Sequence, residues 1–285
     1  MLITLVCLLS CTTDVNIMKT HDDLVDSSVI VDSAEAQDTN TQTSDLTIGL
    51  SEIHFRQIAC PQCVGEPGEF DIRAELLLHH PTSGDYLEYL TPVGTCTTAL
   101  HDTHVSSQPL LSTAIASFND IQLSPTGNGH WWNPAIYEHQ YQRNSLYSIS
   151  TEHGIIENAF QTIEGFDEIN PYTLLWVDPS YAFETVISKS GTTFSWAPTL
   201  PNTQFEIIVA VYSPDGSQFL GAVSCMDNDT GMMTIPGSYV AAYPYWSLAA
   251  VHFIRHKTDR AAAADFNGYI QSHMQWEVVG TGHVE

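Results

Sequence analysis

Basic residues are scarce in this chain of 285 residues, which has 8 Lys and Arg residues against 33 Asp and Glu residues. The formal net charge is therefore -25 at pH 7. A surface this negative repels phosphate backbones and anionic headgroups at ordinary salt concentrations. The composition argues against nucleic-acid binding and against electrostatic docking on membranes, while divalent cations and cationic partners stay open as ligands.

The sequence also lacks a long apolar run and the short motifs of common enzyme classes. The apolar stretch at residues 1–10 is too short to span a bilayer, which needs about 20 residues. No G-x-S-x-G, S-x-x-K or H-E-x-x-H motif occurs, and no Gly-rich phosphate loop precedes a helix. These absences predict that the protein is not an enzyme. Paired carboxylates of the glycosidase kind would leave no motif, so a hydrolase stays an alternative.

The tetrapeptide Leu8-Leu9-Ser10-Cys11 closes the opening stretch. It resembles the lipobox of bacterial lipoproteins, with an aliphatic residue three positions before the cysteine and a small residue directly before it. The resemblance implies a cleaved signal peptide at residues 1–10 and a lipid on Cys11. No basic residue precedes Cys11, because the first is Lys19, and this departure from the pattern points to a start codon other than Met1.

The segment after the lipobox is acidic and has no aromatic residue, Gly or Pro as far as residue 46. Low hydrophobicity and like-charge repulsion cannot offset the entropy cost of ordering such a chain. We therefore expect residues 11–47 to be a lipidated cysteine followed by a disordered acidic tether. In the lipoprotein family an Asp after the cysteine retains many members in the inner membrane. Thr12 stands there instead, so the outer membrane is the preferred location.

From Ile48 onward, apolar and polar residues alternate with a period of two. The alternation is clearest at 69–80, 204–213 and 268–280, and turns rich in Pro, Gly and Asp separate the runs. Each such strand is expected to bury one face. At 268–280 the face expected to be buried holds Ile270, Met274, Trp276 and Val278. The face expected to be exposed holds Gln271, His273, Gln275 and Glu277.

Helical patterns are weak in the folded part. Only residues 258–265 could form a turn or two, and we expect them to bridge the last two strands. The predicted fold class is all-β, with two tandem antiparallel β-sandwiches after the disordered tether. The first sandwich is expected at 48–164 and the second at 165–285.

Two stretches of the second sandwich carry a family resemblance. TTFSWAPTLPNTQFEIIVAVY at 192–212 is similar to immunoglobulin-like and fibronectin type III-like modules, in which a Trp-x-Pro strand precedes an alternating strand. SCMDNDTGMMTIP at 224–236 resembles uncharacterised surface lipoproteins of myxobacteria and their relatives. The resemblance implies a β-sandwich and an envelope location, and it brings no catalytic residue.

Cys60 and Cys63 have the spacing of a redox pair, but no helix pattern follows them and no second C-x-x-C completes a zinc site. Outside the signal peptide and Cys11, four cysteines remain, an even number for an oxidising compartment. We expect at least one structural disulfide. Bonding of Cys60 or Cys63 to Cys96 is favoured because all three lie in the first sandwich, and Cys225 is interpreted as a buried thiol.

The chain has 13 histidines, but none has the spacing of a known metal site, and they are interpreted as polar-face residues of strands. Asp227, Asp229 and the turn at Gly231 imitate the start of a calcium loop. The downstream bidentate Glu is missing, and a hairpin turn explains the same residues. We expect no cofactor and no metal, and Asp227 and Asp229 are kept as a calcium candidate.

Two adjacent tryptophans, Trp131 and Trp132, follow a glycine-containing loop and precede Tyr137. Flat aromatic rings on a loop could stack against a sugar ring or a Pro-rich peptide. The alternative is that one Trp fills the end of the core and the tyrosine covers an outer face.

The sequence thus predicts a lipid-anchored protein of the bacterial cell envelope that acts without catalysis as a binding or structural surface module. Its expected partners are the membrane, through the lipid, and a glycan or protein ligand, but no nucleic acid. Two alternatives are a carbohydrate- or peptide-binding lipoprotein that uses the Trp131 and Trp132 loop, and a hydrolase of envelope polymers.

Overall fold

The structure is a computed structural model, and it describes residues 47–58, 70–82, 90–98, 115–127, 129–136, 146–151, 160–164, 184–197, 200–263 and 268–285. Within these residues the protein is all-β, as the sequence predicts, and a 3-10 helix, η4 (Gly237–Tyr239), is its single helical element. The signal peptide, Cys11, Cys60, Cys63 and Tyr137 lie outside the described residues.

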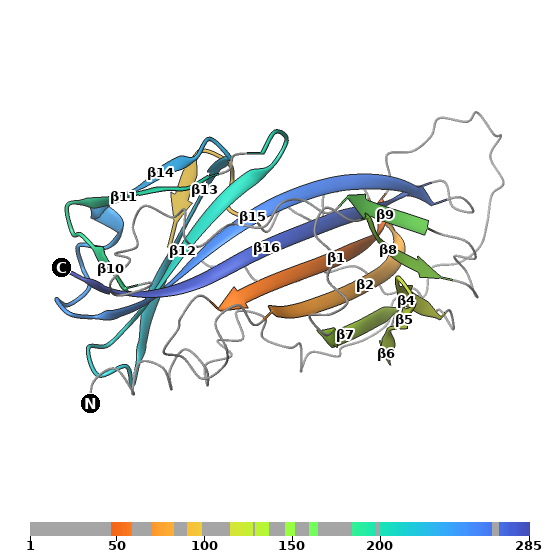
Figure 1. The fold of residues 1–285 in the computed structure, drawn as a ribbon, viewed down its shortest axis with the longest axis horizontal. Coiled ribbons are helices and arrows are strands. Elements are labelled where there is room, and N and C mark those ends of the chain that lie inside the picture. Colours follow the sequence, from red (N-terminus) through yellow and green to blue (C-terminus); the bar gives the residue numbers. More distant parts are fainter. Residues whose placement is uncertain are drawn as a thin grey trace, which may run out of the picture.

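One ten-stranded sheet runs along the length of the molecule, with β15 and β16 as its longest strands (Figure 1). Neighbouring strands are antiparallel, except that β1 and β10 both run parallel to β16. β10 (Glu184–Ile187) pairs with the C-terminal end of β16. The other strands follow in the spatial order β3 (Thr95–Thr97), β13 (Phe219–Asn228), β12 (Gln204–Tyr212), β15 (Leu248–Ala263), β16 (Gly268–Val284), β1 (Thr47–Ile58), β2 (Phe70–Thr82), β7 (His130–Ile136) and β6 (Ser124–Gly127).

Two smaller antiparallel sheets pack on the apolar face of the long sheet. At one end lies the pair β11 (Gly191–Ser195) and β14 (Met232–Pro236), where Phe194 contacts Phe253 of β15 with ring centroids 5.4 Å apart. At the other end lie β5 (Ile121–Gln122), β4 (Ala116–Phe118), β8 (Leu146–Thr151) and β9 (Phe160–Glu164). There Tyr147 of β8 contacts Phe55 of β1 at 5.2 Å.

The core between these layers consists of the apolar positions that the two-residue period predicts. In β12 the side chains of Phe205, Ile207, Val209 and Val211 are fully buried. In β16 Met274, Trp276 and Val278 are buried on the same face as their neighbours in β15 and β1. Complete burial of a large apolar side chain contributes about 1.5–3 kcal/mol, so these alternating residues stabilise the sandwich layers.

The long sheet contains strands from both sides of residue 164, the end of the first expected sandwich. β1 pairs with β16 from residue 47 to residue 58, and β3 pairs with β13. Residues 258–263 belong to β15, which pairs with β16 as far as Ala263 and Gly268. The expectation that these residues leave the strands to form a bridge or a helical turn is therefore wrong.

A disulfide bond joins Cys96 of β3 to Cys225 of β13. The two residues are direct register partners in the antiparallel pair, with Cα atoms 4.0 Å apart. The prediction of a disulfide is confirmed, but the favoured partner of Cys96 and the interpretation of Cys225 as a free buried thiol are wrong. The pairing follows from strand order, which brings together residues 129 positions apart in the chain.

Candidate functional site: a buried histidine and glutamate network

The face of the long sheet opposite to its apolar core carries a concentration of His and Glu side chains. The sequence pattern predicts that those of β16 face outward, yet His273 is 0 % exposed, and Gln271 and Glu277 are also buried. The prediction of one buried face is therefore wrong for β16, which is buried on both. Polar groups removed from water must find partners inside the protein, and on this face they do so with one another.

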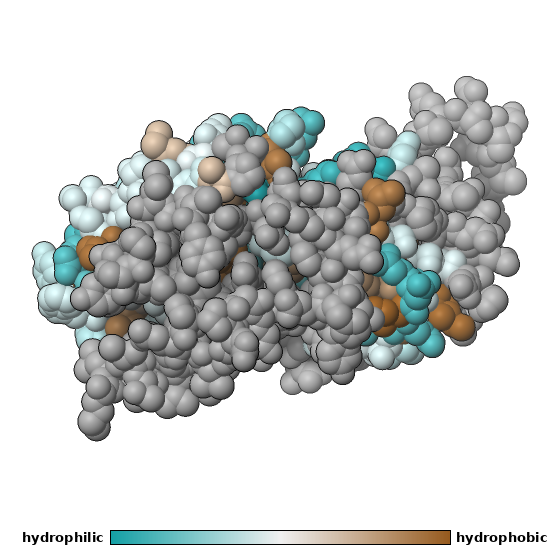
Figure 2. All heavy atoms as spheres, viewed as in Figure 1, coloured by the Kyte–Doolittle hydropathy of each residue, from teal (hydrophilic) through white to brown (hydrophobic). Residues whose placement is uncertain are grey.

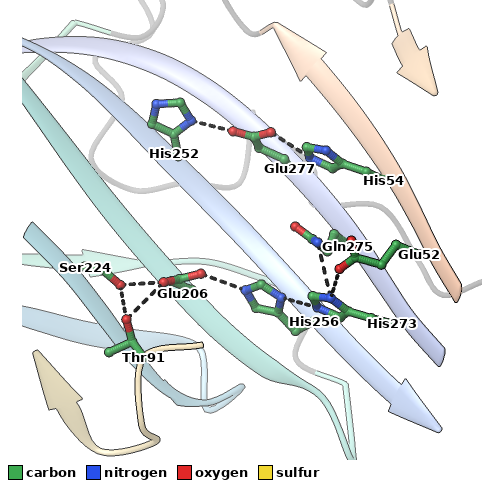
Figure 3. Close-up of polar contacts among 10 residues, drawn as sticks. All are labelled: Glu52, His54, Thr91, Glu206, Ser224, His252, His256, His273, Gln275 and Glu277. Carbon is green, nitrogen blue, oxygen red and sulfur yellow. Dashed lines mark hydrogen bonds and ion pairs between the residues drawn. The ribbon is translucent and has the colours of Figure 1, made fainter. Parts of the chain in front are cut away.

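Four of these side chains form a continuous row across four adjacent strands (Figure 3). His256 Nε2 lies 3.0 Å from Glu206 Oε2, and His256 Nδ1 lies 2.8 Å from His273 Nε2. His273 Nδ1 in turn lies 2.9 Å from Glu52 Oε1, with Gln275 Nε2 at 3.3 Å from the same nitrogen. We call Glu206, His256, His273 and Glu52 the Glu-His-His-Glu row.

Two hydroxyl groups complete the Glu206 end of the row. Ser224 Oγ donates a hydrogen bond to Glu206 Oε1, and Thr91 Oγ1 donates to the same oxygen at 3.3 Å. The two hydroxyl oxygens are 2.5 Å apart. Glu206 thus has hydrogen-bonding partners at both carboxylate oxygens, the arrangement that stabilises an ionised carboxylate away from water.

The geometry of the row fixes how many protons it holds. Each of its three contacts joins two atoms that hydrogen-bond only if one proton lies between them. Two neutral imidazoles supply two protons, so the contact between the two rings requires a third. All three contacts are therefore filled only when the row holds three protons.

Two members of the row have shifted pKa values. Burial raises the pKa of Glu206, but the hydrogen bond and charge of His256, with the hydroxyls of Ser224 and Thr91, outweigh burial and bring the pKa below its usual 4.5. Burial lowers the pKa of His273 below its usual 6.5; Glu52 opposes this effect, and the charge of His256 adds to it. These two lowered pKa values favour an ionised Glu206 and a neutral His273.

A second cluster lies beside the row on the same face (Figure 3). Glu277 of β16 bridges two histidines, with Oε1 hydrogen-bonded to His252 Nδ1 and Oε2 at 2.7 Å from His54 Nε2. Towards the β7 edge of the sheet, His130 Nε2 lies 2.6 Å from Glu75 Oε1. Each of these three histidines thus lies against a carboxylate, which compensates for the partial loss of water around the ring.

Asp229, one half of the calcium candidate, forms a separate buried cluster at the end of β13. Its Oδ2 accepts from Arg255 Nε at 2.8 Å and from Thr203 Oγ1 at 3.1 Å, and its Oδ1 accepts from Trp196 Nε1 at 2.6 Å. Asp227 instead accepts a bond from the neighbouring backbone N–H of Asn228. A carboxylate already paired with a guanidinium does not fit a calcium ligand, so the geometry contradicts this candidate.

A polar pocket of about 370 Å³ opens between these two clusters. His256 of the row and Asp229 both contribute to its lining, which also includes Leu200, Pro201, Asn202, Thr203, Gln204, Asn228 and Thr258. Of the four residues of the row, only His256 lines this pocket, and its side chain is 1 % exposed.

The two tryptophans expected to bind a ligand lie on opposite faces of β7, as consecutive strand residues must. Trp131 is 2 % exposed and belongs to the core, while Trp132 is partly exposed. The two rings therefore do not form one exposed platform. Trp131 lies in the core, as the alternative interpretation expects for one of the two tryptophans.

Neither the protein-family models nor the curated proteins compared with this chain match it. Among the described residues, no group of three or more His, Cys, Asp or Glu side chains has the geometry of a metal site. Within the same residues, no helix is both long and apolar enough to cross a membrane. What the row can do chemically is share and move protons along three short contacts.

The pKa shifts predict that acid destabilises the fold in two steps. A histidine whose pKa is lowered on folding binds its proton more readily when unfolded, so His273 contributes stability above pH 6.5 that is lost as the pH falls through its folded pKa. Glu206 adds a second loss below pH 4.5. We expect the free energy of unfolding, from urea titrations, to fall below pH 6.5 by up to about 1.4 kcal/mol per pH unit for each proton taken up.

The His273→Gln variant isolates the first step. It should show a smaller slope of stability against pH between pH 6.5 and 5, whatever its absolute stability. An unchanged slope in this variant would show that the proton uptake belongs to other groups.

Proposed function

We propose that this protein is a lipid-anchored component of the bacterial cell envelope that acts without catalysis, as a binding or structural surface module. The observation that carries the proposal is the lipobox Leu8-Leu9-Ser10-Cys11 with an acidic segment directly behind it. The lipid on Cys11 would hold the β-sheets at the surface, with the outer membrane as the preferred site.

The described fold is consistent with that location. The Cys96–Cys225 bond needs an oxidising compartment to persist, and the envelope outside the cytoplasmic membrane is one. The charge of -25 would keep such a protein soluble and apart from anionic surfaces, so that the lipid rather than the protein surface supplies the membrane attachment.

The arrangement of titratable groups supports a role without catalysis. A catalytic acid or base must come within hydrogen-bonding reach of its substrate. Glu206, His256 and His273 are instead buried and bonded to one another, and of the three only His256, at 1 % exposure, lines the pocket. The network is better explained as the polar half of a sheet buried on both faces.

Lipidation is tested by metabolic labelling of the full chain with an alkyne analogue of palmitate in a bacterial host. We expect label on the wild-type protein, recovery with the membrane fraction, and loss of both in the Cys11→Ala variant. The Cys7→Ala variant is the matched control, because it removes a cysteine from the same stretch without touching the lipobox cysteine. Equal labelling of wild type and Cys11→Ala would refute the anchor.

A further inference from the structure

Two adjacent aromatic side chains, Tyr245 and Trp246, are exposed at the end of the long sheet near the C-terminus. Their exposed fractions are 62 % and 61 %. Trp246 is the exposed tryptophan of the described part of the chain, since Trp131, Trp196 and Trp276 are buried and Trp132 is half-buried. A large aromatic pair left in water at this position needs an explanation, because such side chains favour interiors and binding sites.

The backbone around this pair is held rigidly. Four hydrogen bonds of 2.7 to 3.0 Å join the segments 187–189, 246–247 and 284–285 to one another. Trp246 itself has a φ of 64°, in the left-handed region that a bulky residue seldom adopts. Strain of this kind persists only where the surrounding structure imposes it, and it concentrates at ligand-binding and other functional positions.

Each ring has one face covered by a neighbouring side chain. Trp246 stacks on the His283 ring with centroids 5.1 Å apart and planes 14° apart. His283 Nε2 lies 3.0 Å from Glu285 Oε1, which fixes the imidazole beneath the indole. Lys189 Nζ lies 4.0 Å from the centroid of the Tyr245 ring. The high exposure of both rings leaves their other surfaces to solvent. We call Tyr245, Trp246, His283 and Lys189 the aromatic platform.

We propose that the aromatic platform binds a neutral carbohydrate, with a sugar ring stacked on Trp246 and its hydroxyls bonded to the polar groups around it. The apolar face of a pyranose matches a flat, preformed indole, and Lys189, Glu285 and the Tyr245 hydroxyl offer the donors and acceptors that sugar hydroxyls require. The net charge of -25 disfavours anionic polysaccharides. This inference rests on the proposed function and specifies the ligand class of the surface module.

The surroundings favour a sugar over a lipid surface or a Pro-rich peptide. In the view of Figure 2, the apolar residues among the coloured ones lie in separate groups. Insertion into a bilayer requires a contiguous apolar face, whereas Tyr245 and Trp246 are flanked by Lys189, His283 and Glu285. Pro-rich peptides bind in aromatic-lined grooves. A pair of rings flanked by a lysine and a His–Glu pair is instead suited to a polyhydroxylated ring.

The test uses the full-length Cys11→Ala protein, so that its outcome does not depend on the lipid anchor. Cellohexaose and chitohexaose are titrated by isothermal calorimetry, with phosphatidylcholine vesicles and a decaproline peptide as separate arms. Trp246→Gly removes the ring at a φ that glycine adopts without strain, and circular dichroism checks that it folds. Phe219→Ala is the matched control, because Phe219 is an exposed aromatic residue at 50 % that lies outside the platform.

We expect millimolar or tighter binding of at least one hexasaccharide, weakened about tenfold or more by Trp246→Gly and by Tyr245→Ala and unchanged by Phe219→Ala. No binding of either sugar, or equal binding by Trp246→Gly, would overturn the proposal. Trp246-dependent binding to vesicles or decaproline, without sugar binding, would also overturn it and assign the platform to that partner. None of these results bears on lipidation, which the labelling experiment measures separately.

Discussion

Replacement of Asp229 by alanine should destabilise the protein by about 3–5 kcal/mol, the range for removing one partner of a buried ion pair. The reason is that Arg255, which is 0 % exposed, loses the carboxylate at 2.8 Å from its Nε. Trp196 Nε1 and Thr203 Oγ1 lose the same acceptor, which increases the cost of the substitution. Urea denaturation, followed by circular dichroism, measures the change in the free energy of unfolding.

Asp227→Ala is the control, because Asp227 lies two residues away on β13 and bonds only to the adjacent backbone among the described contacts. Its substitution should change stability by less than about 0.5 kcal/mol. If Asp229→Ala fails to fold, Thr203→Val removes a hydroxyl that lies 3.1 Å from the same carboxylate and 2.9 Å from the Leu200 carbonyl oxygen, and it should cost about 1 kcal/mol. Equal stability of the Asp229 and Asp227 variants would contradict the buried cluster.

Loss of the Cys96–Cys225 bond is expected to cost about 2–4 kcal/mol, mainly because the unfolded chain is no longer closed into a long loop. The bond spans 129 residues of sequence and ties β3, at the edge of the long sheet, to β13. The double variant Cys96→Ala and Cys225→Ala should therefore unfold at a lower urea concentration than the oxidised wild-type protein.

A peptide map without reductant identifies the bond directly. It should recover Cys96 and Cys225 in one linked peptide, and the Cys60→Ser and Cys63→Ser double variant should retain this link. A map that joins Cys96 to Cys60 or Cys63 would contradict the strand order of β3 and β13.

The apolar core could be predicted from the sequence because alternation in a strand maps directly onto a buried face. Phe205, Ile207 and Val209 are predicted and found inside. The opposite face could not be predicted in the same way, since a polar side chain has the same place in the pattern whether it meets water or a buried partner. The available indication was the group of apolar residues on that outer face, Ile208 and Ile254 among them, which is typical of strands buried on both sides.

The pairing of strands that are far apart in the chain could not be predicted from the sequence pattern either. The Glu-His-His-Glu row joins residue 52 to residues 206, 256 and 273, and only the order of strands β12, β15, β16 and β1 brings them together. The exposed aromatic pair was missed for a related reason. Trp131 and Trp132 are adjacent in a strand and so point apart, whereas Tyr245 and Trp246 lie in a turn and are both exposed, Trp246 with a positive φ.

The central claim, a lipid-anchored module of the cell envelope, is tested most directly by the mass of the mature N-terminus from the envelope of the organism that encodes the protein. The account predicts that the first residue is Cys11, with a diacylglycerol on its thiol and an acylated amine. A mature protein that begins at Thr12, or one that carries an unmodified Cys11, would contradict it.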